Sequence, residues 1–377
     1  MIRILKSNFD IIKYKELQNK LLVNVISDIK PHEISNIGLI LKDPDSKCIY
    51  CVIRDIIMYD ENIELLVQEY KVKTYMEITG YYSESKALTN LEDRKEFLDR
   101  FYTYIFSNDE AKDFIPRYES LGDLEDLEPS IKNAELYESY IKETLFKEFI
   151  DFNSTCSDIF DYSKYIKPIR AEIIVSTKIE VCPYCNESLI HIIDLEPQEI
   201  RALADLDHFY LQSKMPLLGL TFNNFIPSCI KCNRALKLQS VAKILNPCNK
   251  GFDKKARFAL EDPTQLLIKD ISEINVFLKI DETSDEYDEI LASKNLFKLE
   301  EIYNHNSTKK ELKRLSRSTK GLVGGGVKNY QHLFDEEDLT FEKVYEGLLE
   351  FKVDTTDFIN IRYGKLFSDI FSEEYFR

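Results

Sequence analysis

The chain has 377 residues, of which 44% are hydrophobic and 12% aromatic, so it can bury substantial cores and is not a disordered protein. Its length predicts two or three folding units. The net charge of −16 argues against a protein whose whole surface binds nucleic acid. No run of about 18 uncharged apolar residues occurs, and residues 1–18 lack the pattern of a secretory signal, so we expect a cytoplasmic protein without a membrane span.

The charge is unevenly distributed along the chain. Residues 118–151 hold ten acidic residues and three lysines, whereas residues 208–258 hold nine Lys or Arg and one acid, Asp253. A local excess of positive charge inside an acidic protein needs a reason, and phosphate binding is one candidate.

Residues 1–88 are predicted to form a β-rich domain of unknown role. Residues 36–59 contain two β-branched apolar runs around a Pro-Asp-Ser turn, a pattern typical of a hairpin. Residues 64–82 favour further strands, with a helix in their first half left open. Residues 89–165 carry apolar side chains at three- and four-residue spacing, which predicts a helical connector.

Residues 263–377 are predicted to form a mainly helical C-terminal domain. A strand is expected at 274–280, followed by an acidic loop and by amphipathic helices from Lys298 onward. The run VGGGVKNY at 323–330 is typical of a flexible turn, and it is not a phosphate-binding Walker motif because the Gly-Lys-Ser/Thr ending is missing.

Two C-x2-C pairs, Cys182 with Cys185 and Cys229 with Cys232, predict a zinc site. At this spacing a tight turn points two thiolates at one metal, and two such turns complete a tetrahedral four-cysteine site. Such a site has no open coordination position, so the zinc would be structural. Because 43 residues separate the pairs, the metal would fix both ends of a functional loop. Four unrelated buried thiols are the alternative.

The loop between the pairs contains Asp207 and His208 in the stretch DLDHFY. A neutral imidazole can take a proton from water that attacks a phosphodiester, and a neighbouring carboxylate can hold a divalent cation that polarises the phosphate. Asn233, directly after the last cysteine, offers a second oxygen ligand, and Lys237 shares its helix face. We expect a strand that ends at residues 207–208, a loop, a second strand and a helix, which is a ββα-metal arrangement.

The region from Val181 to Leu238 resembles the HNH endonucleases of the four-cysteine zinc-knuckle subtype. The resemblance implies that His208 is the general base and that Asp207 binds the catalytic metal. It implies that Asn224 braces the loop and orients the histidine, and that Asn233 is a ligand where many relatives have histidine. A structural Zn²⁺ and a catalytic Mg²⁺ or Mn²⁺ are the implied cofactors.

The resemblance implies an α+β chain with a central HNH nuclease module at 166–262, which hydrolyses phosphodiester bonds in nucleic acid. DNA is the favoured substrate, with RNA or tRNA as an alternative, and Lys231, Arg234 and Lys237 are predicted to contact phosphates. The chain also resembles bacterial anti-phage nucleases, including the HNH subunits that pair with an ATPase in Septu-type and retron-linked systems. The competing hypothesis is a non-catalytic zinc-knuckle module that binds nucleic acid or serves as a scaffold.

Overall fold

The computed structural model shows a mainly helical protein with three small two-stranded sheets among the residues that it describes. The fold is therefore α+β, as predicted from the sequence. The residues described are 1–4, 6–30, 33, 37–40, 49–59, 70–122, 124–195, 199–240, 243–261, 266, 270–320 and 358–373.

The chain divides into two compact units, each built from separate segments. Unit 1 contains Met1–Ile11, Ala171–Asp207 and Ile226–Arg377, and unit 2 contains Ile12–Arg170 and His208–Phe225. The boundaries of the four domains predicted from the sequence stay a prediction. No helix in the described ranges is long and apolar enough to cross a membrane.

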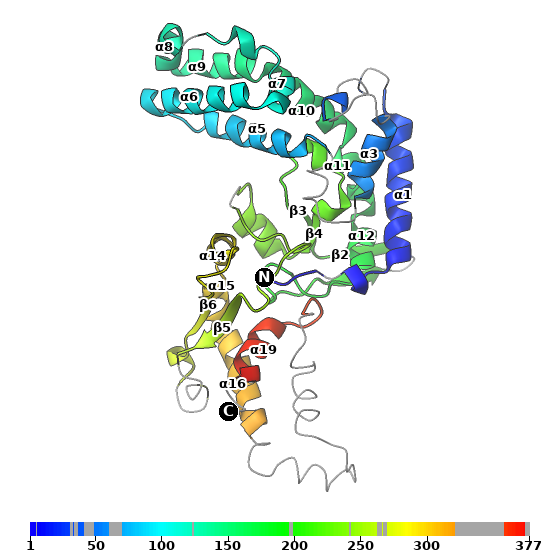
Figure 1. Ribbon diagram of the computed structural model, residues 1–377. Helices are drawn as coiled ribbons and strands as arrows, with labels where there is room; N and C mark the ends of the chain where they lie inside the picture. The colour runs from blue at the N-terminus through cyan, green and yellow to red at the C-terminus, as the bar shows by residue number, and fades with distance from the viewer. Residues whose placement is uncertain are drawn as a thin grey trace. The chain divides into compact units, whose positions relative to one another are not determined.

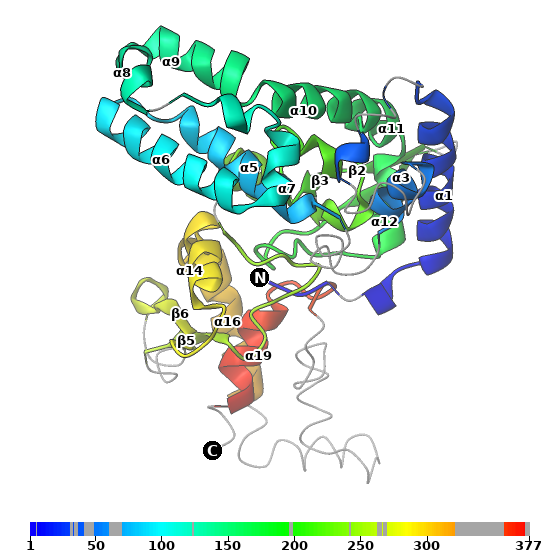
Figure 2. The same cartoon turned by 45° about the horizontal axis from the view of Figure 1, so that its top comes forward.

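The described part of unit 2 is helical (Figure 1). In Figures 1 and 2, α5 and α6 run side by side and α8 lies next to α6. The helices of this unit are α1 (Ile11–Asp28), α3 (Ile49–Met58), α5 (Val72–Ser85), α6 (Leu91–Ser107), α7 (Asp109–Phe114), α8 (Leu124–Lys132), α9 (Ala134–Tyr140), the π-helix η4 (Ile141–Leu145), α10 (Lys147–Ile159) and α11 (Tyr162–Tyr165), with short 3-10 turns η2 (Gly38–Ile40), η3 (Tyr118–Ser120), η5 (Lys167–Ile169), η6 (Pro216–Leu218) and η7 (Phe222–Asn224).

The prediction of a β-rich region at residues 1–88 is wrong for the residues described there, which form α1, α3 and α5. In α3 the fully buried residues are Val52, Ile53, Ile56 and Ile57. Their spacing follows the 3.6-residue period of a helix, and a β-branched composition does not override that period when the apolar face is buried. The Pro-Asp-Ser turn of the expected hairpin lies outside the described residues.

The helical prediction for residues 89–165 is confirmed. Asparagine side chains begin three of these helices, because their oxygen atoms accept hydrogen bonds from backbone N–H groups of the first turn. The helices then bury a cluster of aromatic rings, in which the ring centroids of Phe101 and Phe146 are 4.8 Å apart and those of Tyr75 and Phe149 are 5.8 Å apart. This cluster is the core of unit 2.

Unit 1 contains the three sheets. β1 pairs with β2 and β5 with β6, both antiparallel, while β3 pairs with β4. The last residue of β3 and the first residue of β4 are counted in unit 2. The elements are η1 (Lys6–Asn8), α12 (Arg170–Thr177), β1 (Ile192–Leu195), β2 (Glu199–Ala202), β3 (Asp205–His208), β4 (Phe225–Ser228), the π-helix η8 (Lys231–Lys237), β5 (Ala256–Leu260), η9 (Ile271–Glu273), β6 (Val276–Ile280), α14 (Tyr287–Leu296), α15 (Leu299–Tyr303), α16 (Asn306–Lys320) and α19 (Gly364–Glu373).

The strand predicted at 274–280 is confirmed as β6, and the amphipathic helices predicted after Lys298 are confirmed as α15 and α16. α19 packs against β5, and α14 and α15 pack against β6 (Figure 1). Asp369 of α19 accepts a hydrogen bond from the backbone N–H of Phe258 at 2.8 Å and pairs with the buried Lys365. The glycine-rich run at 323–330 lies outside the described residues.

Candidate metal centre and its carboxylate network

The first C-x2-C pair lies on a tight turn of unit 1. The backbone N–H of Asn186 donates to the carbonyl of Cys182 at 2.7 Å, and the N–H of Cys182 donates to the carbonyl of Ser188 at 2.9 Å. Asn186 takes a φ of 49°, a left-handed conformation that asparagine tolerates better than most residues. This closed turn places the thiols of Cys182 and Cys185 on the same side.

The second pair joins the end of β4 to the start of η8. Cys229 follows the last residue of the strand, and Cys232 is the second residue of the helix. The N–H of Cys232 donates to the Cys229 sulfur at 3.4 Å, and the N–H of Asn233 donates to the Cys229 carbonyl at 3.1 Å. The strand and the helix predicted on either side of this pair are confirmed.

The four sulfur atoms form one buried cluster. All lie within 4.8 Å of one another, and the sulfurs of Cys185 and Cys229 are 4.0 Å apart. In a tetrahedral site with zinc–sulfur bonds of about 2.3 Å, neighbouring sulfurs lie about 3.8 Å apart. The donor set and the spacing therefore fit a zinc ion held by Cys182, Cys185, Cys229 and Cys232, as the sequence predicts.

Burial and mutual contact shift the pKa values of the thiols in the cluster. Burial raises the pKa of Cys182 well above its usual value, whereas hydrogen bonds from neighbouring thiols, Cys182 first, lower the pKa of Cys185 well below it. Four thiolates cannot share this volume without a compensating positive charge, because like charges repel strongly in a buried site. A divalent ion supplies that charge, and its binding releases the thiol protons.

A distant segment of unit 1 holds the first turn in place. The side-chain amide of Asn186 donates to the carbonyls of Phe358 and Ile361, each at 3.0 Å, and its oxygen accepts from the N–H of Lys365 at 3.1 Å. The Tyr303 hydroxyl donates to the Cys185 carbonyl at 2.6 Å. Residues far along the chain therefore complete the surroundings of the cysteine cluster.

Glu187 links both cysteine turns to the same distant segment. Its carboxylate pairs with Lys231 of η8 at 2.7 Å and with Arg362 at 3.0 Å. Burial opposes the charge on Glu187, but the hydrogen bonds from Lys231 and its other partners outweigh it and lower the pKa of the carboxyl. This bridge is a second link between the two turns, beside the sulfur atoms.

Two carboxylates of β3 project toward η8. Because Asp205 and Asp207 are two residues apart on a strand, they share a face. Asp205 accepts two hydrogen bonds from Arg234, at 2.6 and 2.7 Å, and one from the side-chain amide of Asn233 at 3.1 Å. This two-pronged pairing is the strong form of an arginine–carboxylate contact.

Asp207 forms a buried ion pair with Lys237. The two charged groups are 2.8 Å apart, and the side chains are 4% and 2% exposed. The Lys237 ammonium also donates to Oδ1 of Asp207 at 2.9 Å, and the Tyr184 hydroxyl donates to Oδ2 at 2.6 Å. Burial raises the pKa of the Asp207 carboxyl and lowers that of the Lys237 ammonium, while each partner opposes the change in the other. Both oxygens of Asp207 are therefore engaged by the protein.

His208 lies in unit 2, at the start of the segment 208–225. Its Nε2 is 3.0 Å from the carbonyl oxygen of Gly219, and its ring makes edge contacts with Tyr162 and Phe225. A carbonyl oxygen only accepts, so Nε2 is the donor of this hydrogen bond. Gly219 leaves no room for a side chain, since an added Cβ would lie 2.7 Å from the carbonyl oxygen of Phe160.

Asn224 is fully buried and ties both ends of the segment 208–225 together within unit 2. Its oxygen accepts from the N–H of Tyr210 at 2.7 Å, and its amide donates to the carbonyls of Tyr210 and Leu218, each at 3.0 Å. All three contacts are with backbone groups, so the residue fixes the course of the chain on both sides of the loop.

The predicted site residues thus fall on the two units as follows. Unit 1 holds the four cysteines, Asp207 and Asn233, and unit 2 holds His208 and Asn224. The predicted phosphate contacts are all paired with acids of unit 1: Lys231 with Glu187, Arg234 with Asp205, and Lys237 with Asp207.

Sequence reasoning missed three residues that the structure connects to the predicted ones. Asp205 could have been found from its position two residues before Asp207 in a predicted strand. Tyr184 lies inside the first C-x2-C pair, where a side chain next to the metal turn is expected to be buried. No sequence pattern marks Glu187 as a residue of the site, because its partner Lys231 is 44 residues away.

The oxygen donors offer an incomplete fit to Mg²⁺ or Mn²⁺. Asp205, Asp207 and the amide oxygen of Asn233 are the hard ligands that these ions prefer. The ammonium of Lys237, however, lies against Asp207 where a cation would bind. A divalent ion at Asp207 must therefore compete with this lysine.

Comparisons of the chain with protein-family models, with curated proteins and with solved structures found no match.

Proposed function

We propose that the chain is a metal-dependent endonuclease of the HNH type, with DNA as its favoured substrate. The observation that carries the proposal is the four-sulfur cluster, which joins both ends of the segment 186–228. A structural zinc at this place would fix the ends of the segment that contains Asp207, His208 and Asn224. The order of strand, loop, strand and helix over residues 205–237 gives further support.

In this proposal His208 is the general base. The hydrogen bond of Nε2 to the Gly219 carbonyl favours the tautomer whose Nδ1 accepts a proton from the attacking water. Asn224 keeps the loop that carries this acceptor carbonyl in position through its backbone contacts. A proton acceptor with a fixed ring orientation is the requirement for activating water at a phosphodiester.

Asp207 and Asn233 would hold one Mg²⁺ or Mn²⁺, with Asp205 as an additional oxygen donor. The ion would polarise the phosphate and stabilise the charge on the leaving oxygen. Lys237, once displaced from Asp207, would be a cation able to pair with a phosphate oxygen. Release of this lysine by the metal would couple metal binding to substrate binding.

The buried pair of Asp207 and Lys237 favours a second candidate function, a non-catalytic zinc-knuckle module that binds nucleic acid or serves as a scaffold. In that case Lys237 neutralises Asp207 permanently. The variant Lys237→Met separates the two. The nuclease proposal expects it to bind Mn²⁺ more tightly than the wild type in a calorimetric titration. Equal or absent Mn²⁺ binding in both proteins would favour the module.

Cleavage of plasmid DNA and tRNA by the purified protein, with Mg²⁺, Mn²⁺ or EDTA, tests the proposal directly. We expect metal-dependent cutting by the wild type and at least a hundredfold slower cutting by His208→Ala, since general base catalysis contributes about 10²–10⁴-fold. His191→Ala, at an exposed histidine of unit 1, is the matched control and should cut normally. Zinc content and melting temperature are recorded for all three proteins.

A role in anti-phage defence with an ATPase partner is part of the proposal. If the wild type binds nucleic acid without cutting it, the assay is repeated with an ATPase partner and ATP. Cutting that appears only then supports a nuclease under partner control. Binding without cutting under every condition sinks the nuclease proposal and leaves the binding module.

A further inference from the structure

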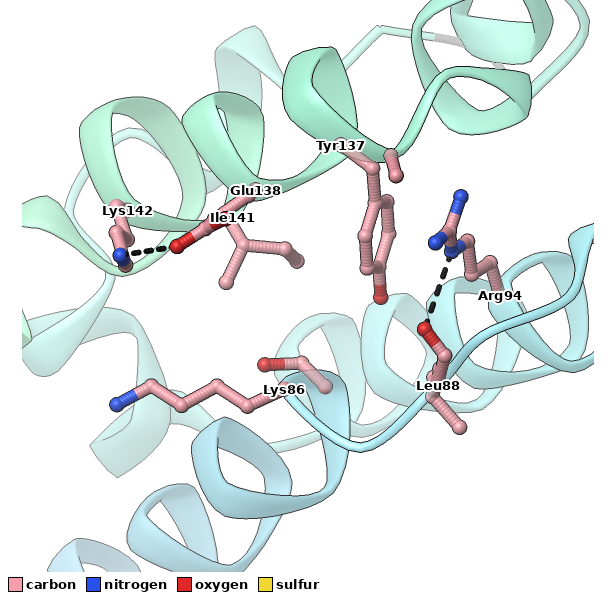
Figure 3. A pocket seen from close by; sticks show the side chains of 9 residues that line it. Lys86, Leu88, Arg94, Tyr137, Glu138, Ile141 and Lys142 are labelled. Carbon is pink, nitrogen blue, oxygen red and sulfur yellow. Dashed lines mark hydrogen bonds and ion pairs between the residues drawn. The ribbon is translucent and has the colours of Figure 1, made fainter.

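Unit 2 contains a cavity that is remote in sequence from the cysteine pairs. Its volume is about 350 Å³, a size within the range of small-molecule sites. The end of α5, the start of α6, α9 and the first residues of η4 form its walls (Figure 3). Three cationic side chains and one acidic side chain line it.

Arg94 is the buried cation of the cavity, with a side chain that leaves the residue only 6% exposed. It donates to the carbonyls of Leu88 at 3.3 Å and Ile131 at 2.8 Å, and its guanidinium stacks 4.5 Å from the ring centre of Tyr137. These bonds use two of the five N–H donors of arginine. No carboxylate pairs with Arg94 in the described part of the chain. A buried charge without an opposite charge is costly.

The hydroxyl of Tyr137 is a second unsatisfied group in the same cavity. The residue is 4% exposed, and its hydroxyl has no hydrogen-bond partner among the described residues. Burial raises the pKa of Tyr137 to about 12, so the phenol keeps its proton at neutral pH and is available as a donor. Arg94 and Tyr137 therefore offer hydrogen-bond donors that no acceptor among the described residues uses.

The rim of the cavity adds positive charge. Lys86 is exposed, and its ammonium lies 3.7 Å from the ring centre of Tyr82. Lys142 is also exposed and pairs with Glu138. Three positive charges against one negative charge leave an excess of two. In Figure 3 the two lysines lie at one side of the cavity and Arg94 at the other, with Ile141 and the Tyr137 ring between them.

We propose that this cavity binds a small organic phosphate monoester. Its phosphate would accept hydrogen bonds from Arg94 and Tyr137, and its organic part would lie against Ile141 and Leu88. A phosphate monoester carries nearly two negative charges at neutral pH, which matches the excess of positive charge better than a carboxylate does. Charge-assisted bonds to arginine are the strong ones, and they would satisfy the donors left without partners. This site is independent of the proposed nuclease activity.

Calorimetric titration of the full chain with inorganic phosphate, AMP, glucose 6-phosphate, adenosine and citrate tests the proposal. We expect the two esters to bind and the neutral adenosine not to bind. Tyr137→Phe should weaken ester binding roughly tenfold, the effect of about one hydrogen bond, without lowering the melting temperature of the free protein. Lys86→Met should weaken it several-fold. Lys73→Met, at an exposed lysine of α5 outside the cavity, is the matched control and should bind normally.

Each alternative result overturns part or all of the proposal. Inorganic phosphate that binds as tightly as the esters would exclude a subsite for the organic part. Citrate that binds as tightly would exclude a preference for phosphate. If neither ester binds at millimolar concentration, or if Tyr137→Phe and Lys86→Met bind as tightly as the control, the cavity is not the binding site.

Discussion

Unit 2 buries mostly aromatic rings, whereas unit 1 buries two ion pairs and four cysteines. Of the largest fully buried side chains, nine lie in unit 2 and two, Tyr184 and Tyr303, lie in unit 1. Unit 1 instead buries the pairs of Asp207 with Lys237 and of Lys365 with Asp369. Apolar burial is non-directional, while buried ion pairs and metal ligands work only with the correct partner. The stability of unit 1 should therefore be most sensitive to a change in the chemical type of one side chain. The stability of unit 2 should be most sensitive to a change in side-chain volume.

Removal of the metal is the sharpest test of this comparison and should have the largest effect. Structural zinc contributes on the order of 10 kcal/mol to folding in small zinc domains. We expect Cys232→Ser to lose zinc and to expose the amides of unit 1 to hydrogen exchange, while the helices of unit 2 stay protected. Cys51→Ser, at a half-buried cysteine outside the cluster, should keep zinc and protection. Equal loss of protection in both units would contradict the comparison.

Truncation of a core ring is the converse test. Phe149 packs against Tyr75 and Phe146 in unit 2. Phe149→Ala should lower the free energy of unfolding of unit 2 by about 4 kcal/mol, because it leaves a cavity in a packed core. Zinc content, measured by mass spectrometry, should not change. If Phe149→Ala loses its zinc, a change that destabilises unit 2 also destabilises unit 1.

Loss of the Asn186 side chain should destabilise unit 1 by a smaller amount. Asn186→Ala removes three side-chain hydrogen bonds and leaves at a φ of 49° an alanine, which tolerates this left-handed conformation less well than asparagine. We expect a loss of about 3 kcal/mol in denaturant unfolding with zinc present. Asn186→Gly keeps the backbone conformation accessible, so its free energy of unfolding should fall by less than that of Asn186→Ala. Equal losses for both variants would mean that the conformation contributes nothing.

The smallest effect is expected at a helix cap of unit 2. Asn133 accepts hydrogen bonds from the N–H groups of Glu135 and Leu136 at the start of α9. Asn133→Ala should lower the free energy of unfolding by about 1 kcal/mol, whereas Asn133→Asp should keep most of the stability of the wild type. Thermal unfolding of the three proteins measures both values. A loss well above this size would show that Asn133 supports more than the helix end.

The sequence was sufficient for features that depend on local spacing. Each C-x2-C pair predicted a turn with two thiols, and residues 205–237 predicted β3, β4 and η8. Both depend on neighbours within a few residues, where geometry follows from spacing. The helices of residues 89–165 were predicted for the same reason.

The remaining features depend on partners that the sequence does not connect. Residues 49–58 are rich in β-branched side chains, yet they form α3 because one helical face is buried. The partners of Asp207 could not be read from spacing, since Tyr184 is 23 residues and Lys237 is 30 residues away. The sequence does not indicate that Arg94 is buried in a cavity, because an arginine in an amphipathic helix is usually exposed.

The contacts of Asn186 with residues 358–365 have a consequence for synthesis of the chain. The first cysteine turn leaves the ribosome more than 170 residues before the segment that completes its surroundings. All four cysteines are made by residue 232, so we expect zinc to bind a nascent chain whose site is still partly open. Nascent chains stalled once Cys232 has left the exit tunnel should then bind zinc but release it faster to a chelator than the full-length chain does. Equal release rates would show that the late segment does not secure the metal.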